Sequence, residues 1–389
     1  MTDTAPITDF AQLGLSEETL ACLSFTTPTA IQAQILPHTL AGFDAIGQAQ
    51  TGTGKTMAFL LTILHALEKH PFTPDEIRYV GEPRALVLAP TRELAQQIFK
   101  DCESINSGCF YNLCLTGGSN AAQQAKAINQ RPLDIVIGTP GRILDWLTRG
   151  ILFVDRVEIL VLDEADRMLD MGFIVAIKQI VAKLPANTQR QSLLFSATFN
   201  ADVLNLAHRW LYKPVMVSVT SSQTTNIDIT ERFYLLSEAQ KMAALLALLH
   251  QQPPNDKVIV FANSKHQVNK LVTYLAHHFP KNTVVALSGD IAQDRRERHL
   301  AAFQAGMATV LVATDVAGRG IHVDDVALVI NYNLPDSPDD YVHRIGRTGR
   351  AGRAGVAISL IDENDAFNVT ALEQHLKKRL VLTQFELES

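Results

Sequence analysis

Short apolar runs that alternate with helical stretches constrain the fold of this chain more than any other feature. Four of them end in small or polar residues: RALVLAPT (84–91), DIVIGTP (134–140), EILVLDEAD (158–166) and QSLLFSAT (191–198). Strands that are apolar on both faces are typical of parallel sheets covered by helices, and such sheets bind ligands at the carboxyl ends of their strands. We therefore expect an α/β fold in which the four ends meet at one edge of a sheet.

A second series of the same kind follows the polar stretch VTSSQTTNIDIT (219–230), which has no helical periodicity. Its predicted strands are KVIVFANS (257–264), NTVVALSGD (282–290), ATVLVATD (308–315) and VALVINYNLP (326–335). The chain has 389 residues, enough for two domains. The sequence predicts a first α/β domain over 1–212, a linker over 213–228 and a second α/β domain over 229–389.

Composition is that of an ordinary globular protein, with 47% hydrophobic and 19% charged residues. No apolar run approaches the roughly 18 residues that span a bilayer, and the N-terminus lacks the pattern of a signal peptide. The four cysteines have no C-x-x-C spacing, which favours reduced, mostly buried thiols and a cytoplasmic location. The formal net charge is −6, without the basic excess of many nucleic-acid-binding proteins. A nucleic acid would therefore be bound through local contacts.

The segment AQTGTGKT (49–56) is the strongest single functional signal. Backbone N–H groups in a glycine-rich turn bind phosphates at a helix N-terminus, whereas a flexible Gly/Thr turn is the alternative without function. In such a loop the lysine reaches the β- and γ-phosphates, and the hydroxyl after it binds Mg²⁺. Alanine stands where the general pattern has its first glycine. The predicted phosphate-binding residues are Ala49, Gln50, Thr51, Gly52, Thr53, Gly54, Lys55 and Thr56.

Three carboxylates, Asp163, Glu164 and Asp166, follow the apolar run ILVL (159–162). Like charges this close repel one another and are costly to desolvate, so a solvated turn is the simplest interpretation. A nucleotide site, however, needs an acid after a second strand to hold Mg²⁺, which also offsets the repulsion. Asp163 fits that role, and Glu164 can orient and deprotonate an attacking water. Residues 167–173 are predicted to pack as a helix without chemistry.

Ten motifs occur in the order in which one family carries them. They are TTPTAIQ (26–32), AQTGTGKT (49–56), PTRELA (90–95), GG (117–118), TPGR (139–142), DEAD (163–166), SAT (196–198), VFANS (260–264), ATDVAGRGI (313–321) and HRIGRTGR (343–350). With them the chain resembles the DEAD-box RNA helicases from about Phe10 to Leu360. The resemblance implies two tandem RecA-like domains, each a mostly parallel sheet with helices on both faces. It also implies an RNA-stimulated ATPase that uses ATP and Mg²⁺.

The resemblance implies roles around the nucleotide. Phe10 would stack on adenine, although an ordinary core aromatic is the alternative. Gln32 would read the adenine edge and make the site selective for ATP. Arg347 and Arg350 would be arginine fingers that reach the γ-phosphate, worth about 10³–10⁵ in rate in related enzymes.

The resemblance also implies a link from the ATP site to strand separation. Ser196 and Thr198 would make it through hydrogen bonds toward Asp166 and His343.

RNA contacts are implied in both domains. Contacts to the sugar–phosphate backbone hold a strand without reading its sequence, and the 2′-hydroxyl lets a protein prefer RNA to DNA. For each residue singly, a helix cap or turn is the alternative. The matching positions are Thr91, Arg92, Gly118, Thr139 and Arg142 in the first domain and Gly289, Gln293, Arg296, Thr314 and Gly318 in the second.

His322 departs from the family pattern, because most members carry there an Asp that contacts the ATP ribose. The same His occurs in the bacterial RhlB-type members, which the chain also resembles in GQAQTGTGKTMAFL (47–60) and FANSKH (261–266). That resemblance implies an endoribonuclease or RNA-degradation complex as partner. The basic C-terminal tail of that type is reduced to KKR (377–379), so we expect weak RNA anchoring without a partner.

Three functions are compatible with these residues. An ATP-dependent RNA helicase that unwinds duplexes locally or remodels RNA–protein particles is the leading one. A partner-dependent, ATP-driven RNA clamp or scaffold is left open by the acidic balance. A DNA translocase of the same superfamily is disfavoured by the Gln32 motif and by the DEAD sequence itself.

Overall fold

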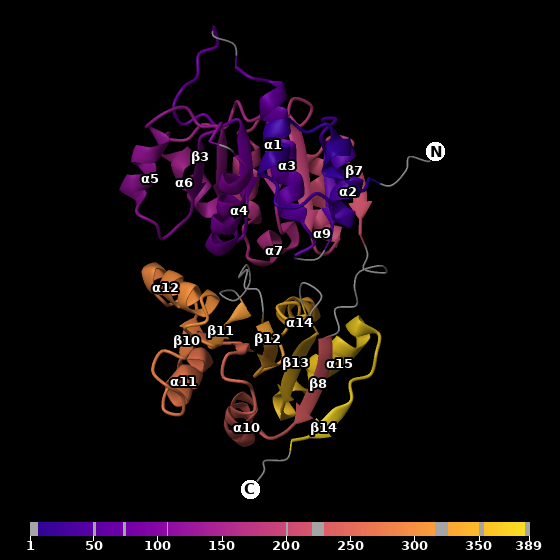
Figure 1. The fold of residues 1–389 in the computed structure, drawn as a ribbon, viewed down its shortest axis with the longest axis vertical. Helices are drawn as coiled ribbons and strands as arrows, with labels where there is room; N and C mark the ends of the chain where they lie inside the picture. The colour runs from indigo at the N-terminus through magenta and orange to yellow at the C-terminus, as the bar shows by residue number, and fades with distance from the viewer. Residues whose placement is uncertain are drawn as a thin grey trace. The chain divides into compact units, whose positions relative to one another are not determined.

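The computed structural model describes residues 7–49, 52–72, 75–106, 108–199, 201–219, 229–315, 326–349 and 354–385. The chain divides into two compact units, Met1–Ser222 and Gln223–Ser389 (Figure 1). Each unit is built around its own sheet, as the two series of apolar runs predicted.

The first unit contains a seven-stranded sheet whose paired strands are all parallel. Across the sheet the strands are β3 (Asn112–Leu115), β4 (Ile135–Gly138), β2 (Ala85–Leu88), β5 (Ile159–Leu162), β6 (Gln191–Ser196), β1 (Ala45–Gln48) and β7 (Val215–Ser218). The four runs that were predicted to converge are β4, β2, β5 and β6, which are consecutive in this order. Since parallel strands share one carboxyl edge, that prediction is confirmed.

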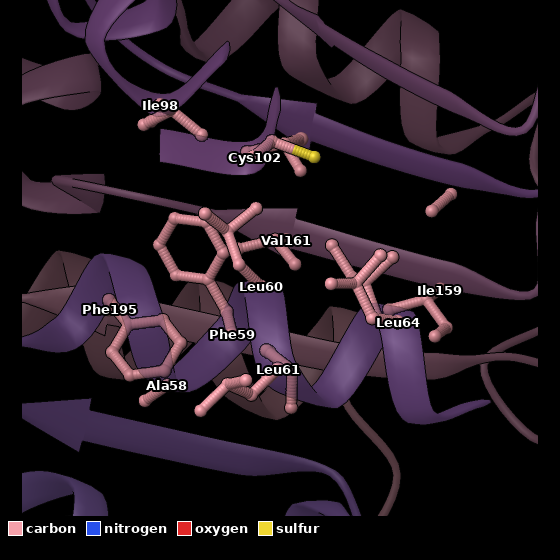
Figure 2. Close-up of a cluster of buried hydrophobic side chains, with 14 of the residues drawn as sticks. Ala58, Phe59, Leu60, Leu61, Leu64, Ile98, Cys102, Ile159, Val161 and Phe195 are labelled. Atoms are coloured by element: carbon pink, nitrogen blue, oxygen red, sulfur yellow. The ribbon is translucent and has the colours of Figure 1, made fainter. Parts of the chain in front are cut away.

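Helices cover both faces of this sheet (Figure 1). One face packs on α2 (Ala30–Thr39), α3 (Lys55–Lys69) and α4 (Arg92–Ile105), and the other on α6 (Pro140–Thr148), α7 (Ala165–Asp170), α8 (Ile174–Val181) and α9 (Ala201–Trp210). The remaining helices are η1 (Phe10–Leu13), α1 (Glu17–Cys22) and α5 (Ala121–Ile128). Figure 2 shows the first of these cores, where Phe59, Ile98, Val161 and Phe195 come together from helices and strands.

Helix α4 illustrates why the sequence forms these helices. Leu94, Ile98, Cys102 and Ile105 recur every three or four residues and are buried, which is the period of one helix face. Thr91 caps the first turn, because its Oγ1 accepts a hydrogen bond from the Leu94 backbone N–H at 3.2 Å. The apolar stripe thus faces the sheet, and the capped N-terminus lies directly after β2.

The second unit repeats this architecture with another seven-stranded sheet whose paired strands are parallel. Its strand order is β10 (Val284–Leu287), β11 (Val310–Ala313), β9 (Lys257–Phe261), β12 (Val326–Asn331), β13 (Gly355–Ile361), β8 (Ile229–Leu235) and β14 (Leu382–Gln384). One face packs on α10 (Glu238–His250) and α11 (Lys265–Leu275). The other packs on α12 (Gln293–Gln304), α14 (Pro338–Ile345) and α15 (Ala366–Leu376), the last preceded by η2 (Glu363–Asp365).

Part of the predicted linker, 213–228, is a strand. Val215–Ser218 form β7, which pairs with β1 at the edge of the first sheet. Asp44 fixes the segment that leads into β7. The buried Asp44 carboxylate accepts a hydrogen bond from the Tyr212 backbone N–H at 2.7 Å, and the Asp44 carbonyl accepts one from the Val215 N–H at 2.8 Å. A four-residue edge strand has too little periodicity to be recognised in the sequence, so long-range contacts decide whether the segment forms a strand. Residues 220–228 lie outside the described residues.

The four cysteines are free thiols. Burial raises the pKa of Cys102 to about 12, so this thiol is unreactive near neutral pH. Cys22 and Cys114 are half-buried and Cys109 is exposed, so fewer of the thiols are buried than expected. Within the part of the chain that the structure describes, no helix is long and apolar enough to cross a bilayer.

Candidate functional site

The carboxyl edge of the first sheet carries six of the seven motifs predicted for the first domain, all except TTPTAIQ (26–32). In the order of the strands, the segments that follow them are Gly117–Gly118 after β3, Thr139–Arg142 after β4, Thr91–Arg92 after β2, Asp163–Asp166 after β5, Ala197–Thr198 after β6 and Ala49–Thr56 after β1. The predicted RNA residues therefore occupy one half of this edge and the predicted nucleotide residues the other. The acids after β5 lie where the two halves meet.

The phosphate loop connects β1 to α3. Gly52 and Gly54 have φ values of 85° and 95°, a left-handed conformation that glycine adopts without strain. A Cβ on Gly54 would lie 2.4 Å from Gln32 Nε2, so only glycine fits there. Lys55 is buried at the start of α3, and its Nζ donates to the Ala49 carbonyl. This hydrogen bond joins Ala49, the first residue of the loop, to the lysine near its end. Gln50 and Thr51 lie outside the described residues.

Gln32 packs directly against this loop. Its Nε2 donates to the Gly54 carbonyl at 2.9 Å, and its Oε1 accepts the Thr29 backbone N–H at 2.8 Å. An amide has a second N–H and a second lone pair. Gln32 can therefore hold the loop and still offer one donor and one acceptor to a base.

Phe10, predicted to stack on adenine, is a core aromatic in this structure. It is 1% exposed and its ring centroid lies 5.7 Å from that of Phe25. Phe25 is 40% exposed, so it is the ring of this pair with a face open to a ligand. Phe25 stands immediately before the segment TTPTAIQ (26–32) and was not among the predicted site residues.

Asp163, the first residue after β5, has a deeply buried carboxyl group. It is 3% exposed, and burial raises its pKa to about 7, with Lys55 opposing the rise and Glu164 adding to it. A carboxylate that is buried this deeply without enough positive charge favours a bound cation. Its oxygens and the Thr56 hydroxyl are ligands of the kind that Mg²⁺ prefers. The residues present therefore fit the predicted metal.

Glu164 has an unusual backbone for a residue with a side chain. Its φ and ψ are 51° and 54°, in the left-handed region that costs a non-glycine residue of the order of 1–2 kcal/mol. Its carboxylate accepts a hydrogen bond from Arg167 Nη1 at 3.2 Å. Strain of this kind clusters at functional sites, where surrounding contacts maintain it.

Asp166 joins the acids to the segment after β6. Its Oδ2 accepts the Ala197 and Thr198 backbone N–H groups at 3.2 and 2.9 Å and the Thr198 hydroxyl at 2.9 Å. The Ser196 hydroxyl in turn accepts the Asp166 backbone N–H at 3.3 Å. The structure thus brings together the residues expected to link the ATP site to strand separation, while His343 belongs to the second unit.

Arg92, at the start of α4, lies against the glycine pair. Gly118 has a φ of 77°, and a Cβ there would lie 1.8 Å from Arg92 Nη1. The paired glycines therefore let the guanidinium lie close to the backbone, next to Thr91, the cap of α4.

The TPGR segment forms the start of α6. Thr139 is the N-cap residue. Arg142 donates to Gln124 Oε1 at 2.8 Å, an atom that also accepts the Trp146 indole N–H at 3.1 Å. Arg142 is therefore held by neighbours in a defined orientation at this edge.

A Gly118→Ala variant should bind RNA about tenfold more weakly, because a methyl group displaces Arg92 by steric conflict. The readout is the RNA concentration for half-maximal ATPase stimulation. Gly150→Ala is the matched control, because Gly150 lies outside the predicted RNA segments, has a left-handed φ of 64° like Gly118, and a Cβ there would meet no described atom within 4 Å. Equal RNA affinity of the Gly118→Ala variant and the parent would remove the assigned role of this glycine.

In the second unit, Gly289 and Thr314 follow the neighbouring strands β10 and β11. A Cβ on Gly289 meets nothing within 4 Å, so a ligand backbone can approach it. Gln293 begins α12, which also carries Arg296. The remaining residues predicted here for RNA or ATP, Gly318, His322 and Arg350, lie outside the described residues.

The arginines of HRIGRTGR differ in their surroundings. Arg344 is internal: it is 2% exposed, pairs with Asp315 at 2.5 and 2.6 Å and donates to Asn263 Oδ1 at 2.8 Å. It therefore ties together three motifs of the second unit and is not available to a polyanion. Arg347, one of the predicted fingers, donates through Nε to the His343 carbonyl at 3.3 Å.

A phosphate loop and strand-end acids on one parallel sheet, followed by a second domain of the same architecture, define a two-domain P-loop nucleotide hydrolase. The family model of the DEAD/DEAH box helicases matches residues 29–206, and that of the helicase conserved C-terminal domain matches residues 240–352. The chain belongs to the DEAD/DEAH box helicase family.

Curated relatives include proteins named ATP-dependent RNA helicase RhlB. The Pseudomonas putida protein is 46% identical over 377 residues, covering 96% of this chain and 94% of the relative. The Aeromonas hydrophila protein is 42% identical over 383 residues, covering 98% and 88%. The resemblance to the RhlB type is therefore confirmed.

Two solved structures extend the comparison to the fold. Saccharomyces cerevisiae Dbp5 bound to RNA and ADP BeF3 has a TM-score of 0.83 at 31% identity, covering 97% of this chain and 96% of that chain. Mss116p bound to ssRNA and AMP-PNP has a TM-score of 0.87 at 27% identity, covering 100% and 81%. The predicted fold of two tandem RecA-like domains is confirmed.

Proposed function

We propose that this helicase couples hydrolysis of ATP to ADP and phosphate with binding and local unwinding of RNA. The observation that carries the proposal is the division of one sheet edge between phosphate-loop and RNA residues, with Asp163, Glu164 and Asp166 between them. The names of the relatives, which are RNA helicases, support it.

The chemistry at the first domain follows from these positions. Lys55 and the loop N–H groups bind the β- and γ-phosphates, and Gln32 offers its remaining amide groups to adenine. The proposed site for the base is beside Phe25, since that ring is the accessible one. Mg²⁺ bound by Thr56 and Asp163 would neutralise charge on the phosphates.

Glu164 acts on the water. It orients a water molecule in line with the γ-phosphorus and accepts its proton while the bond to the leaving ADP oxygen breaks. Arg347 and Arg350 of the second domain are the proposed fingers that stabilise charge on the transferred group, and His322 is the proposed contact to the ribose.

RNA would be held through its backbone by Thr91, Arg92 and Arg142 in the first domain, and by Thr314 and Arg296 in the second. Asp166 would carry nucleotide state to Ser196 and Thr198, to which it is hydrogen-bonded. Following the resemblance to the RhlB type, we also propose that the protein partners an endoribonuclease of RNA degradation and acts in the cytoplasm.

The test measures ATP turnover by the purified chain with an RNA oligonucleotide, with the DNA oligonucleotide of the same sequence, and with neither. RNA should stimulate turnover by about tenfold or more, and DNA should not. A second assay follows ATP-dependent displacement of a short RNA duplex. Stronger stimulation by DNA would favour a DNA translocase, and RNA-stimulated turnover without displacement would favour a clamp or scaffold; either would overturn the proposal.

A further inference from the structure

Arg167, to which the sequence analysis gave no function, is buried beside the proposed general base. Its side chain is 5% exposed and pairs with Glu164 through Nη1 at 3.2 Å. Within the described residues, its Nε and Nη2 groups are buried and have no hydrogen-bond partner. This one long ion pair therefore satisfies only part of the hydrogen-bonding capacity of the Arg167 guanidinium.

Such an arrangement is a poor structural ion pair. Burying a guanidinium is costly, and the cost is recovered only where its donors are well paired. A buried polar group left partly unpaired in a native structure often reflects a functional requirement. Arg167 follows Glu164 by three residues, at the start of α7, so its position is set by the strained backbone that also sets Glu164.

A second carboxylate acts on the same guanidinium from the RNA half of the edge. Burial lowers the pKa of Arg167, whereas Glu164, Asp166 and Glu93 raise it. Glu93 stands in the first turn of α4, directly after Thr91 and Arg92, and its Oε1 is buried. Strands β2 and β5, which lead into α4 and α7, pair with each other, so Glu93 and Arg167 begin from neighbouring positions on the sheet edge. Arg167 therefore lies between the proposed general base and a carboxylate next to the proposed RNA contacts.

We propose that Arg167 is a positioning residue that exchanges between Glu164 and Glu93 and thereby couples RNA binding to activation of the attacking water. Without RNA, its pairing with Glu164 holds the base away from a water. When RNA binds at the N-terminus of α4, Glu93 takes the donors Nε and Nη2. Glu164 is then released to accept a proton. The inference rests on the proposed function, because it requires Glu164 to be the base and α4 to contact RNA.

The exchange requires a planar guanidinium with several donors, which a lysine ammonium does not supply. The test therefore compares Arg167→Lys and Glu93→Gln in the full chain. The measured quantity is the ratio of kcat with saturating RNA to kcat without RNA, together with the KM for ATP. Both variants should lower the ratio about tenfold, a typical size for coupling between sites, with the KM for ATP changed by less than about twofold.

Two matched controls lie in the same domain. Arg149→Lys alters an exposed ion pair with Asp145, and Glu103→Gln alters a carboxylate further along α4. Both should keep the parent ratio. Melting temperatures identify any variant that fails to fold. If Arg167→Lys is unstable, Glu93→Gln still tests the coupling, because it leaves the buried arginine in place.

A parent-like ratio in Glu93→Gln, or in a folded Arg167→Lys, overturns the inference. So does a parent-like ratio of the double variant. A Glu164→Gln variant separates failure of the proposed function from failure of the coupling. If Glu164→Gln turns over ATP like the parent, Glu164 is not the general base and the proposed function is wrong. If Glu164→Gln is inactive while the other variants keep the parent ratio, only the coupling through Arg167 is wrong.

Discussion

Replacing Glu164 by Gln is expected to lower RNA-stimulated kcat by about 10²–10⁴-fold, the usual contribution of a general base. Gln keeps the size and the hydrogen bonding of the side chain but cannot accept the proton of the attacking water. Because Lys55, Asp163 and the loop glycines are untouched, nucleotide binding should remain. Phosphate release at saturating ATP and RNA measures the first effect, and equilibrium binding of a fluorescent ATP analogue measures the second.

Glu103→Gln on α4 is the control for this substitution, since it makes the same chemical change outside the site. Its turnover should equal that of the parent. If Glu164→Gln hydrolyses ATP at the parent rate, Glu164 is not the base. If it no longer binds nucleotide, Glu164 acts in binding and the assignment is again wrong.

Replacing Lys241 by Ala is expected to destabilise the protein by about 3–5 kcal/mol. Lys241 is fully buried in the second unit, with its Nζ 2.6 Å from Asp362 Oδ2 and 3.1 Å from Asp365 Oδ2. Alanine leaves two carboxylates facing each other without their cation. Urea unfolding of the full chain measures the loss, and Arg298→Ala, in an exposed pair with Asp294, should change stability by less than about 0.5 kcal/mol.

The same variant should change how stability depends on pH. In the parent, burial raises the pKa of Asp362, but hydrogen bonds from Lys241 and Asn364 outweigh it and hold the pKa below its usual value of 3.8. The stability from this group is present above pH 3.8 and is lost as pH falls through the lower folded pKa. Without Lys241, burial raises the pKa, so the variant gains stability as pH falls toward 4. A stability difference that does not shrink between pH 7 and pH 4 would contradict this account.

Most of the fold could be predicted because its signals are local. Runs such as ILVL (159–162) have the apolar continuity of buried strands, and the residues of the phosphate loop follow a strand at a characteristic spacing. β7 was assigned to the linker, because only pairing with β1 and the hydrogen bonds of Asp44 distinguish it from a loop. Short edge strands depend on contacts that are distant in sequence.

Individual site residues also differ in how far the sequence alone could place them. Asp166, Ser196 and Thr198 were expected to act together, and they are hydrogen-bonded. Phe10 was expected to stack on adenine, with a core aromatic as the alternative, because an aromatic side chain has the same hydropathy whether it fills a core or faces a ligand. Phe10 is buried in the first hydrophobic core and Phe25 is exposed, a difference that only the tertiary packing sets.

The sequence by itself determined the α/β class, the tandem RecA-like fold and the family, because glycine-rich loops, strand-end acids and their spacing are local properties of the chain. Only the tertiary structure decided which of these side chains face one another. In the sequence, Arg344 stands within HRIGRTGR and Arg167 directly follows DEAD. Arg344 is fully hydrogen-bonded inside the second unit. Arg167 is buried next to Glu164, and its Nε and Nη2 have no hydrogen-bond partner among the residues that the structure describes. The pairing of a buried charge is set by distances between segments far apart in sequence, and no local pattern encodes it.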